Sequence, residues 1–440
     1  MSLFGAMNTA ISGLDAQSTA FGNISENVAN SQTVGYKRVD TNFVDYLTTS
    51  TANVNDPGAV VAKPDYVNNV QGTITQTDNP LGLAIAGQGF FAVSQQAGQS
   101  NGEPTFNPQQ YYTRAGDFQL NSTGYMVNSA GDYLNGWTVD PSTGIVNENS
   151  LAPIQVTQTV FNPVATANVT LSANLPATPA SGTAISTSPI SSDIDVFDAL
   201  GTQHVVTMNW VQNSADDWTV SLTSPDAAGG PAIGSAEVQF GALSGNGVPE
   251  GTVGQIFNTT GNVTSPGYAA NTTASLSFSA DFGSGNQTIN LNMGSYGGTS
   301  GITQYAGTQY NLEGLTQDGV PPGSYAGVTT QTNGDVVVNY NNGQSRTIAQ
   351  VPIITFNNTN ALQGQNGQSF TATTNSGTPL AEQASTNGAG NLVTGSVESS
   401  NVDIATEFSA LIVAQQAYSA NAKMVTSAQT MLQTTIDMKQ

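Results

Sequence analysis

The last forty residues carry the most regular apolar pattern in the chain. Residues 401–440 contain no glycine and no proline, and apolar or near-apolar residues recur there at alternating steps of four and three. This heptad spacing keeps one face of a helix against a partner helix. The predicted contact positions are Ile404, Phe408, Leu411, Gln415, Tyr418, Ala422, Val425, Gln429, Leu432 and Ile436.

The first thirty residues repeat this spacing. Their predicted contact positions are Leu3, Met7, Ala10, Leu14, Gln17, Phe21, Ile24 and Val28. Gly5, Gly13 and Gly22 each cost about 1 kcal/mol relative to alanine inside a helix, so we expect this segment to be helical only when it packs. Ser2 and Asn401 are the expected N-caps. Two such segments at opposite termini predict an antiparallel helix pair from which the intervening chain loops outward.

Some large apolar side chains of these segments lie off the predicted contact line. They are Ile11, Ile412, Val413 and Met431. Because two helices cannot bury all of their apolar surface on each other, we expect these four side chains to meet other copies of the chain. The partner helix should instead be faced by Leu411, Tyr418, Val425 and Leu432.

The sequence between the two helices predicts short antiparallel strands. Apolar runs alternate with Asn/Gly turns, as at Asn333-Gly334 and Asn342-Gly343. We expect a mainly β chain with a terminal coiled-coil stem. Its expected parts are a helical stem (1–33 and 401–440), an extended connector (34–80 and 357–400), a first β domain (81–146 and 287–356) and an inserted outer β domain (147–286).

The charge balance of the 440-residue chain limits its partners. Asp and Glu number 29 against 7 Lys and Arg, giving a formal net charge of −22. Because such a chain repels phosphate, nucleic acid and anionic membranes are poor partners. The absence of cysteine excludes disulfides and thiol catalysis. No apolar run is long enough to predict a membrane span, and the first residues lack the pattern of a cleaved secretory signal.

Few residues suggest catalysis or metal binding. His204 is the only histidine, so a surface strand-end residue is favoured over a Ser-His-Asp arrangement. Asp193, Asp195 and Asp198 cluster in one segment, and they predict either a calcium site or, preferably, a solvated acidic edge. We therefore expect neither an enzyme nor a bound cofactor.

The residues that follow the first helix carry a recognisable motif. It consists of Ala29, Asn30, Thr33, Gly35, Tyr36 and Lys37. Together with Ser400-Asn401-Val402-Asp403 and the Ala414–Lys423 stretch, it resembles the terminal signatures of bacterial flagellar rod and hook proteins.

The first motif has the character of a helix exit. Asn30 and Gly35 tolerate left-handed backbone, and Tyr36 should pack back on the stem. Lys37 and Arg38 either interact with the helix dipole or form an ion pair with an acid of a neighbouring subunit.

The resemblance implies a structural subunit most like those of the flagellar hook. Such subunits would polymerise into a flexible helical tube outside the cell that transmits torque from rod to filament as a universal joint. The implied partners are further copies of the chain, the rod, the hook cap, the hook-filament junction proteins and the flagellar export apparatus, without a cleaved signal peptide. Two alternatives remain open: a distal rod subunit, and an extracellular β protein that binds or cleaves glycans.

Overall fold

The computed structural model describes residues 3–50, 55–140, 143–177, 188–242, 247–307 and 309–438, but not the side chains of Leu3 and of residues 48–50 and 55–57. The expected N-cap Ser2 lies outside these residues. The chain is mainly β and forms two compact units. The first comprises Met1–Gln158, Ala326–Asn339 and Ser345–Gln440, and the second comprises Thr159–Tyr325 and Tyr340–Gln344.

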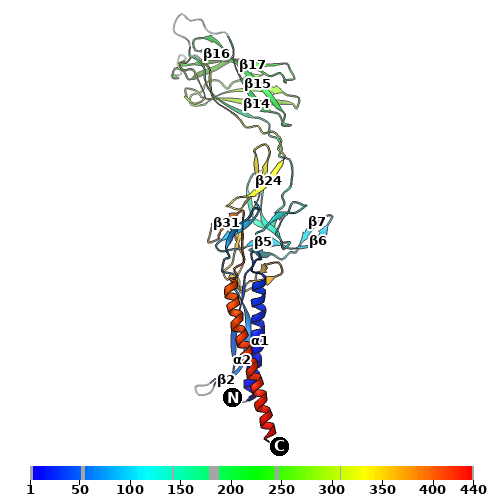
Figure 1. Cartoon of the computed structure of the whole chain (residues 1–440). Coiled ribbons are helices and arrows are strands. Elements are labelled where there is room, and N and C mark those ends of the chain that lie inside the picture. Colours follow the sequence, from blue (N-terminus) through cyan, green and yellow to red (C-terminus); the bar gives the residue numbers. More distant parts are fainter. Residues whose placement is uncertain are drawn as a thin grey trace. The chain divides into compact units, whose positions relative to one another are not determined.

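The two terminal segments form helices that lie side by side and antiparallel (Figure 1), as the apolar pattern predicts. They are α1 (Leu3–Ala29) and α2 (Ile404–Asp437). The N-cap of α2 is Asp403, whose carboxylate accepts the backbone N–H groups of Ala405 and Thr406. The expectation that Asn401 caps this helix is therefore wrong.

Small side chains bring the two helices together. The buried residues of α2 are Glu407, Ala414 and Ala428, and Asn421 continues their seven-residue spacing. On α1, a Cβ atom at Gly13 would lie 2.8 Å from Asn421 Nδ2. The glycine that weakens the isolated helix therefore makes room for the partner helix.

The observed contact line of α2 is displaced from the predicted one. The predicted positions Ile404, Phe408, Tyr418 and Ile436 are 41–55 % exposed, and Gln415 and Gln429 are also exposed. Leu411, Ala422, Val425 and Leu432 are half-buried, and the Tyr418 ring reaches Phe21 edge-on at 6.3 Å between centroids. The line shifts because Ala414 and Ala428 of α2, together with Gly13 of α1, allow closer approach than the larger residues at 404 and 408.

The predicted contact positions of α1 lie mostly on its covered side. Ala10 and Ile24 are buried, and Met7, Leu14, Gln17, Phe21 and Val28 are half-buried. Part of this burial comes from a second neighbour, a long β-hairpin, which the apolar spacing of α1 did not indicate.

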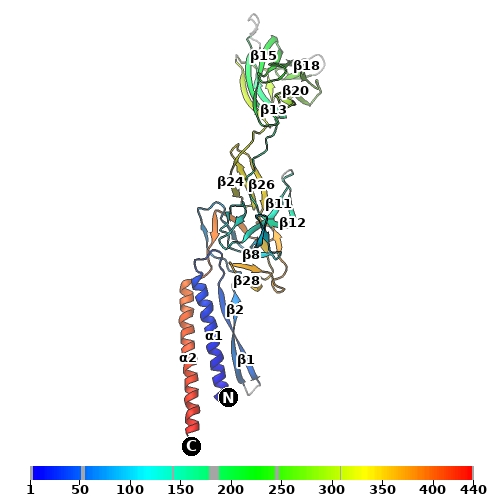
Figure 2. The same cartoon turned by 90° about the vertical axis from the view of Figure 1, so that its right-hand side faces the viewer.

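That hairpin replaces much of the expected extended connector. Strands β1 (Val39–Ser50) and β2 (Asn55–Tyr66) pair antiparallel and lie beside α1 (Figure 2). Polar side chains of α1 bind its backbone, since Asn27 Nδ2 donates to Val39 O and Ser12 Oγ accepts from Val60 N. The expectation of an extended connector at 34–80 is wrong because these cross-strand and helix contacts cannot be seen in the local pattern.

The second half of the expected connector, 357–400, also forms strands that pair with distant segments. These pairs are β3 (Ile74–Gln76) with β32 (Ser396–Glu398), β4 (Leu83–Ala86) with β31 (Asn391–Thr394), and β27 (Ile353–Thr355) with β30 (Leu380–Glu382). The hairpin β6 (Gln96–Ser100)–β7 (Glu103–Phe106) and the 3-10 helix η1 (Thr359–Ala361) complete the smaller elements of this part of the chain.

The main sheet of the first unit contains eleven strands. They are β5 (Phe91–Ser94), β8 (Tyr111–Thr113), β9 (Gln119–Leu120), β10 (Met126–Val127), β11 (Tyr133–Val139), β12 (Val146–Pro153), β24 (Tyr325–Thr330), β25 (Asp335–Tyr340), β26 (Ser345–Gln350), β28 (Gln363–Gln365) and β29 (Ser369–Thr371). The order is β24-β25-β26-β11-β5-β8-β29-β28, with β12 and β10 beside β11 and β9 beside β10.

The second unit is a β-sandwich. Its first sheet contains β13 (Asn168–Asn174), β19 (Val263–Thr264), β20 (Thr273–Asp281), β21 (Asn286–Ser295), β22 (Ile302–Thr303) and β23 (Asn311–Gln317). Its second sheet has the order β14 (Ile190–Phe197), β15 (Gln203–Ser214), β16 (Asp217–Thr223), β17 (Ala232–Phe240), β18 (Val253–Gly261). Both sheets contribute to one buried core that includes Trp210, Leu222 and Phe278.

The structure divides the two β domains differently from the expected 147–286 boundary. Residues 287–325 join the second unit because β21 pairs with both β20 and β13. Residues 147–158 join the first unit, where β12 pairs with β11. Strand-like pattern locates such segments, but it does not identify the strand with which each one pairs.

The close helix contact predicts opposite outcomes at two glycines of α1. Gly13→Leu should destabilise the helix pair by roughly 1–3 kcal/mol, because the new side chain collides with Asn421. Gly22 has no atom within 4 Å of a built Cβ, so Gly22→Leu should preserve or raise stability. Urea unfolding followed by far-UV circular dichroism compares them, and equal losses would contradict the close contact at Gly13.

Candidate functional site

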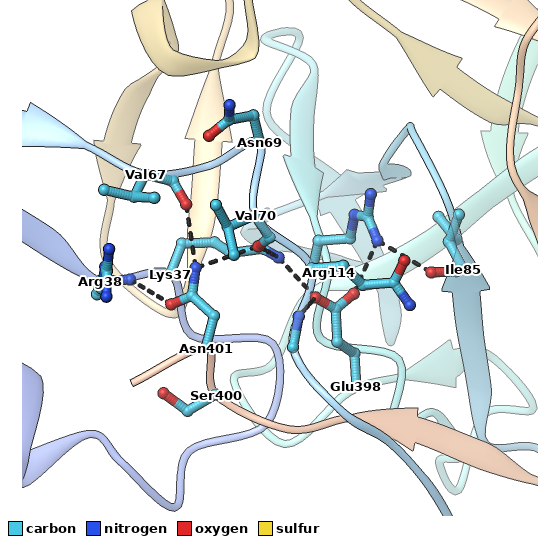
Figure 3. Close-up of polar contacts among 12 residues, drawn as sticks. Lys37, Arg38, Val67, Asn69, Val70, Ile85, Arg114, Glu398, Ser400 and Asn401 are labelled. Atoms are coloured by element: carbon cyan, nitrogen blue, oxygen red, sulfur yellow. Dashed lines mark hydrogen bonds and ion pairs between the residues drawn. The ribbon is translucent and has the colours of Figure 1, made fainter. Parts of the chain in front are cut away.

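Three charged side chains meet in a buried cluster where the helices join the first β unit (Figure 3). Lys37 follows α1, Arg114 follows β8 and Glu398 ends β32. Lys37 Nζ lies 2.5 Å from Glu398 Oε1, and Arg114 Nη1 lies 2.8 Å from Glu398 Oε2. The carboxylate is 1 % exposed, so one acid binds two cations away from water.

Backbone carbonyls around this cluster accept further hydrogen bonds from both cations, although Arg114 Nε has no hydrogen-bond partner among the described residues. Lys37 Nζ donates to Val70 O at 2.7 Å, and Arg114 donates to Ile85 O and Gly87 O at 3.0 and 2.6 Å. Burial lowers the pKa of Lys37, the charge of Glu398 raises it and that of Arg114 lowers it further. Because removing charges from water is costly, the two cations depend on the negative charge of Glu398 that lies between them.

The motif after α1 positions Lys37 for this contact. Gly35 has φ +70°, and a Cβ there would lie 2.3 Å from Ala115 N, so only glycine fits. Its N–H donates to Glu398 O. Asn30 accepts a hydrogen bond from Thr33 Oγ1 and donates to Glu26 O, which closes the turn after Ala29, the last residue of α1.

Tyr36 is buried and packs back on the stem through Asn27. Its hydroxyl donates to Asn27 Oδ1 at 3.1 Å. Burial raises the pKa of Tyr36, and the charges of Glu26 and Glu407 raise it further. The tyrosine is therefore held as a neutral hydrogen-bond donor.

Asn27 also joins α1 to α2. Its Nδ2 donates to Glu407 Oε1 at 3.2 Å as well as to Val39 O. Burial raises the pKa of Glu407, although the hydrogen bond from Asn27 opposes the shift. A single asparagine thus connects the first helix, its exit and the second helix.

Asn401 connects the segments that enter and leave the stem. Its Oδ1 accepts from Arg38 N at 2.8 Å, and its Nδ2 donates to Val67 O and Val70 O. Figure 3 shows this side chain beside Lys37 and Glu398. The residue expected to cap α2 therefore holds the chain just before that helix.

The two basic residues of the motif bind acids of their own chain. Lys37 is buried against Glu398, so the prediction that it pairs with a neighbouring subunit is wrong. Arg38 Nη2 lies 3.3 Å from Asp40 Oδ2, which likewise assigns it a partner within the chain. Sequence reasoning missed Glu398 and Arg114, although an acid within the strand pattern Ser396-Val397-Glu398 was a signal for a buried partner of one of the few basic residues.

The side chains expected to meet other subunits are uncovered in the single chain. Ile11, Ile412, Val413 and Met431 are 48–65 % exposed. Phe4 and Met424 add to this apolar surface without having been predicted. The stem is also almost uncharged: α1 carries Asp15 and Glu26, and α2 carries Glu407, Lys423 and Asp437.

The candidate ion-binding aspartates do not form a metal site. Asp193 and Asp195 are exposed on one face of β14, whereas Asp198 accepts the N–H groups of Leu200 and Thr202 in the following turn. Within the described residues, no group of three or more His, Cys, Asp or Glu side chains could hold a metal ion. His204 is buried rather than at the surface, between Asp198 and Asp226, which corrects that expectation.

No helix among the described residues is long and apolar enough to cross a membrane.

Models of four flagellar protein families match the chain in the order of its terminal helices and inserted β units, and they identify an axial protein of the bacterial flagellum. These are "Flagella basal body rod protein" at 7–37, "Flagellar hook protein FlgE/F/G D1 domain" at 84–174, "Flagellar basal body protein FlaE D2 domain" at 165–320 and "Flagellar basal body rod FlgEFG protein C-terminal" at 393–438.

Two relatives indicate which flagellar axial protein this chain resembles. The Flagellar hook protein FlgE of Brucella suis is 30% identical over 443 residues, covering 100% of both chains. That of Salmonella typhimurium is 29% identical over 447 residues, covering 99% of this chain and 100% of the relative. The chain belongs to the flagellar hook protein family and is a structural hook subunit, and neither the distal rod nor the glycan-binding alternative is favoured.

The ion cluster predicts a large effect of neutralising its acid. Glu398→Gln leaves Lys37 and Arg114 buried without a counter-charge and should lower the free energy of unfolding of the first unit by about 3–5 kcal/mol. Glu148→Gln is the matched control, because Glu148 is exposed in the same unit. Urea unfolding measures both variants, and a loss no larger than that of the control would refute the role of Glu398.

Removing the charge of Glu407 should raise the stability of the chain by an amount that depends on pH. Its raised pKa means that the charged form is disfavoured in the folded chain, so its contribution to stability falls as pH rises through that pKa. Glu407→Gln should therefore stabilise the chain at pH 7, with the gain vanishing below about pH 4, where glutamate is protonated in both states. Urea unfolding across this range, with exposed Glu26→Gln as control, tests this; a gain independent of pH would contradict it.

Proposed function

We propose that the exposed apolar surface of the paired helices is the element through which this hook subunit polymerises. The observation that supports this is the exposure of Ile11, Ile412, Val413 and Met431 on a stem with almost no charge. Burial of apolar surface contributes roughly 25 cal/mol per Å², whereas a stable solvent-facing helix normally carries charges. Association through this surface also offsets the mutual repulsion of chains with a net charge of −22.

The mechanical role of the subunit follows from this mode of assembly. Helical stems packed together form the wall of a tube, and the β units project from it. The outward-facing strand positions of the second unit include small polar side chains, such as the exposed Ser191 and the half-buried Thr207 and Ser277, and contacts of this kind are readily exchanged for water. Such a tube can bend as it rotates, so it acts as the universal joint that transmits torque from rod to filament.

The same proposal gives the subunit a non-enzymatic role and a set of partners. Rod subunits lie below it, the hook cap directs its addition, and hook-filament junction proteins lie above it. It leaves the cell through the flagellar export apparatus without a cleaved signal peptide. The composition supports partners of this kind over nucleic acid or lipid, because the chain is strongly acidic.

A double substitution on α2 tests the polymerisation surface. Ile412→Gln with Val413→Gln should prevent tube formation while leaving the circular dichroism of the monomer unchanged, because both side chains are exposed in the single chain. Leu200→Gln is the control, since Leu200 is 72 % exposed on the second unit. Electron microscopy and sedimentation measure assembly. Tubes of normal length from the double variant, or their loss in the control alone, would contradict the proposal.

A further inference from the structure

The second unit contains a single side chain that can become a cation near neutral pH. Residues 159–325 and 340–344 contain no lysine and no arginine, and His204 is the only histidine of the chain. This residue lies at the start of β15 and is 7 % exposed. A proton on this ring adds a positive charge to a unit that has no other cationic side chain.

Two carboxylates flank the His204 ring. Nδ1 lies 3.2 Å from Asp226 Oδ2, and Nε2 lies 3.6 Å from Asp198 Oδ2. The ring also stacks on Phe282 at 4.5 Å between centroids, with 12° between the planes. We call these four residues the His204 cluster.

The members of the His204 cluster come from different turns at one end of the sandwich. Asp198 lies between β14 and β15, Asp226 between β16 and β17, and Phe282 between β20 and β21. Asp281 lies nearby, but its carboxylate accepts the N–H groups of Gly283 and Gly285 in its own turn. The charged groups that face the ring are therefore Asp198 and Asp226.

The turn that begins at Asp198 contacts the two segments by which the chain enters and leaves this unit. A Cβ at Gly201 would lie 2.5 Å from Pro322 Cδ and 2.6 Å from Pro163 Cβ, so the turn lies directly on both prolines. Their segments pair with each other through the bridges Phe161–Gly323 and Val164–Val320. The turn is therefore packed against the two segments that connect this unit to the rest of the chain.

Protonation changes what the imidazole can bind. A neutral ring has one N–H and can donate to one carboxylate, and in the described structure Nε2 has no hydrogen-bond partner. An imidazolium has two N–H donors and can bind Asp226 and Asp198 together, while its charge favours the stacked Phe282 ring. Although burial raises the pKa of Asp198, the N–H groups of Thr202 and Leu200 and the side chain of Ser284 hold it below its usual value, so Asp198 is available as a carboxylate partner.

We infer that the His204 cluster is a pH-dependent contact that stabilises the end of the second unit at which the chain enters and leaves it. A proton taken from solvent onto the ring closes the Nε2–Asp198 contact and joins the turns of Asp198 and Asp226. The added stability is present at acid pH and is lost as pH rises through the range, about 5 to 8, in which histidine changes charge. This inference does not depend on polymerisation.

Hydrogen exchange of the full-length chain tests it directly. Protection factors, corrected for the intrinsic effect of pH, are measured by mass spectrometry on peptides spanning 198–202, where Leu200 and Thr202 donate to Asp198. Protection should rise about tenfold from pH 7.5 to 5.5, the ratio expected for one charge-assisted hydrogen bond. His204→Gln should abolish this rise, and Asp195→Asn, at an exposed position on β14, should retain it.

A second measurement covers the case in which His204→Gln does not fold. The one histidine gives one set of ring resonances, so its titration in the unmodified chain can be followed by NMR without ambiguity. The protection of 198–202 should change with the same midpoint as these resonances. A ring that titrates without a change in protection, or an equal rise in His204→Gln, would overturn the inference.

Discussion

One buried carboxylate, that of Glu398, holds together three segments that are far apart in the sequence. Glu398 binds Lys37 from the exit of the first helix and Arg114 from the first β unit, and the strand that carries it leads into the second helix. Burying the two cations without this acid would be strongly unfavourable, so all three segments must be in place in the folded chain. The neighbouring bonds of Asn27, Gly35 and Asn401 depend on the same arrangement, because they bridge the same segments. The relation between the two terminal helices is thus fixed by polar contacts at one end.

This constraint explains why the helices can associate through so narrow a surface. Ala414, Asn421 and Ala428 lie on one side of α2, where Asn421 meets Gly13 of α1, and the contact leaves Phe408 and Ile436 more than half exposed. A coiled coil that used Phe408 and Ile436 for its own pairing would have less apolar surface left for other copies. Stability within the chain and capacity for assembly are therefore divided between different faces of α2.

The sequence predicts the parts of this arrangement that depend on local pattern. Both terminal helices, their pairing and the β character of the intervening chain follow from heptad spacing and turn residues. The sequence pattern does not predict which line of α2 contacts α1, because the lines through 404/408 and through 407/414 both fit a heptad. Only the close packing at Gly13 distinguishes the two lines. The Lys37–Glu398 pair, 361 residues apart in sequence, and the transfer of β21 to the second unit depend on long-range pairing that no local signal contains.

Polar contacts within one chain thus order the stem, and we propose that its uncovered apolar face binds other copies. Helical reconstruction of the native polymer by electron cryo-microscopy, at a resolution that shows side chains, tests both halves at once. We expect that Glu398 keeps Lys37 and Arg114 of its own chain, and that Ile412, Val413 and Met431 are buried against neighbouring subunits. A polymer in which those three side chains face solvent, or in which Glu398 pairs with another copy, would contradict it.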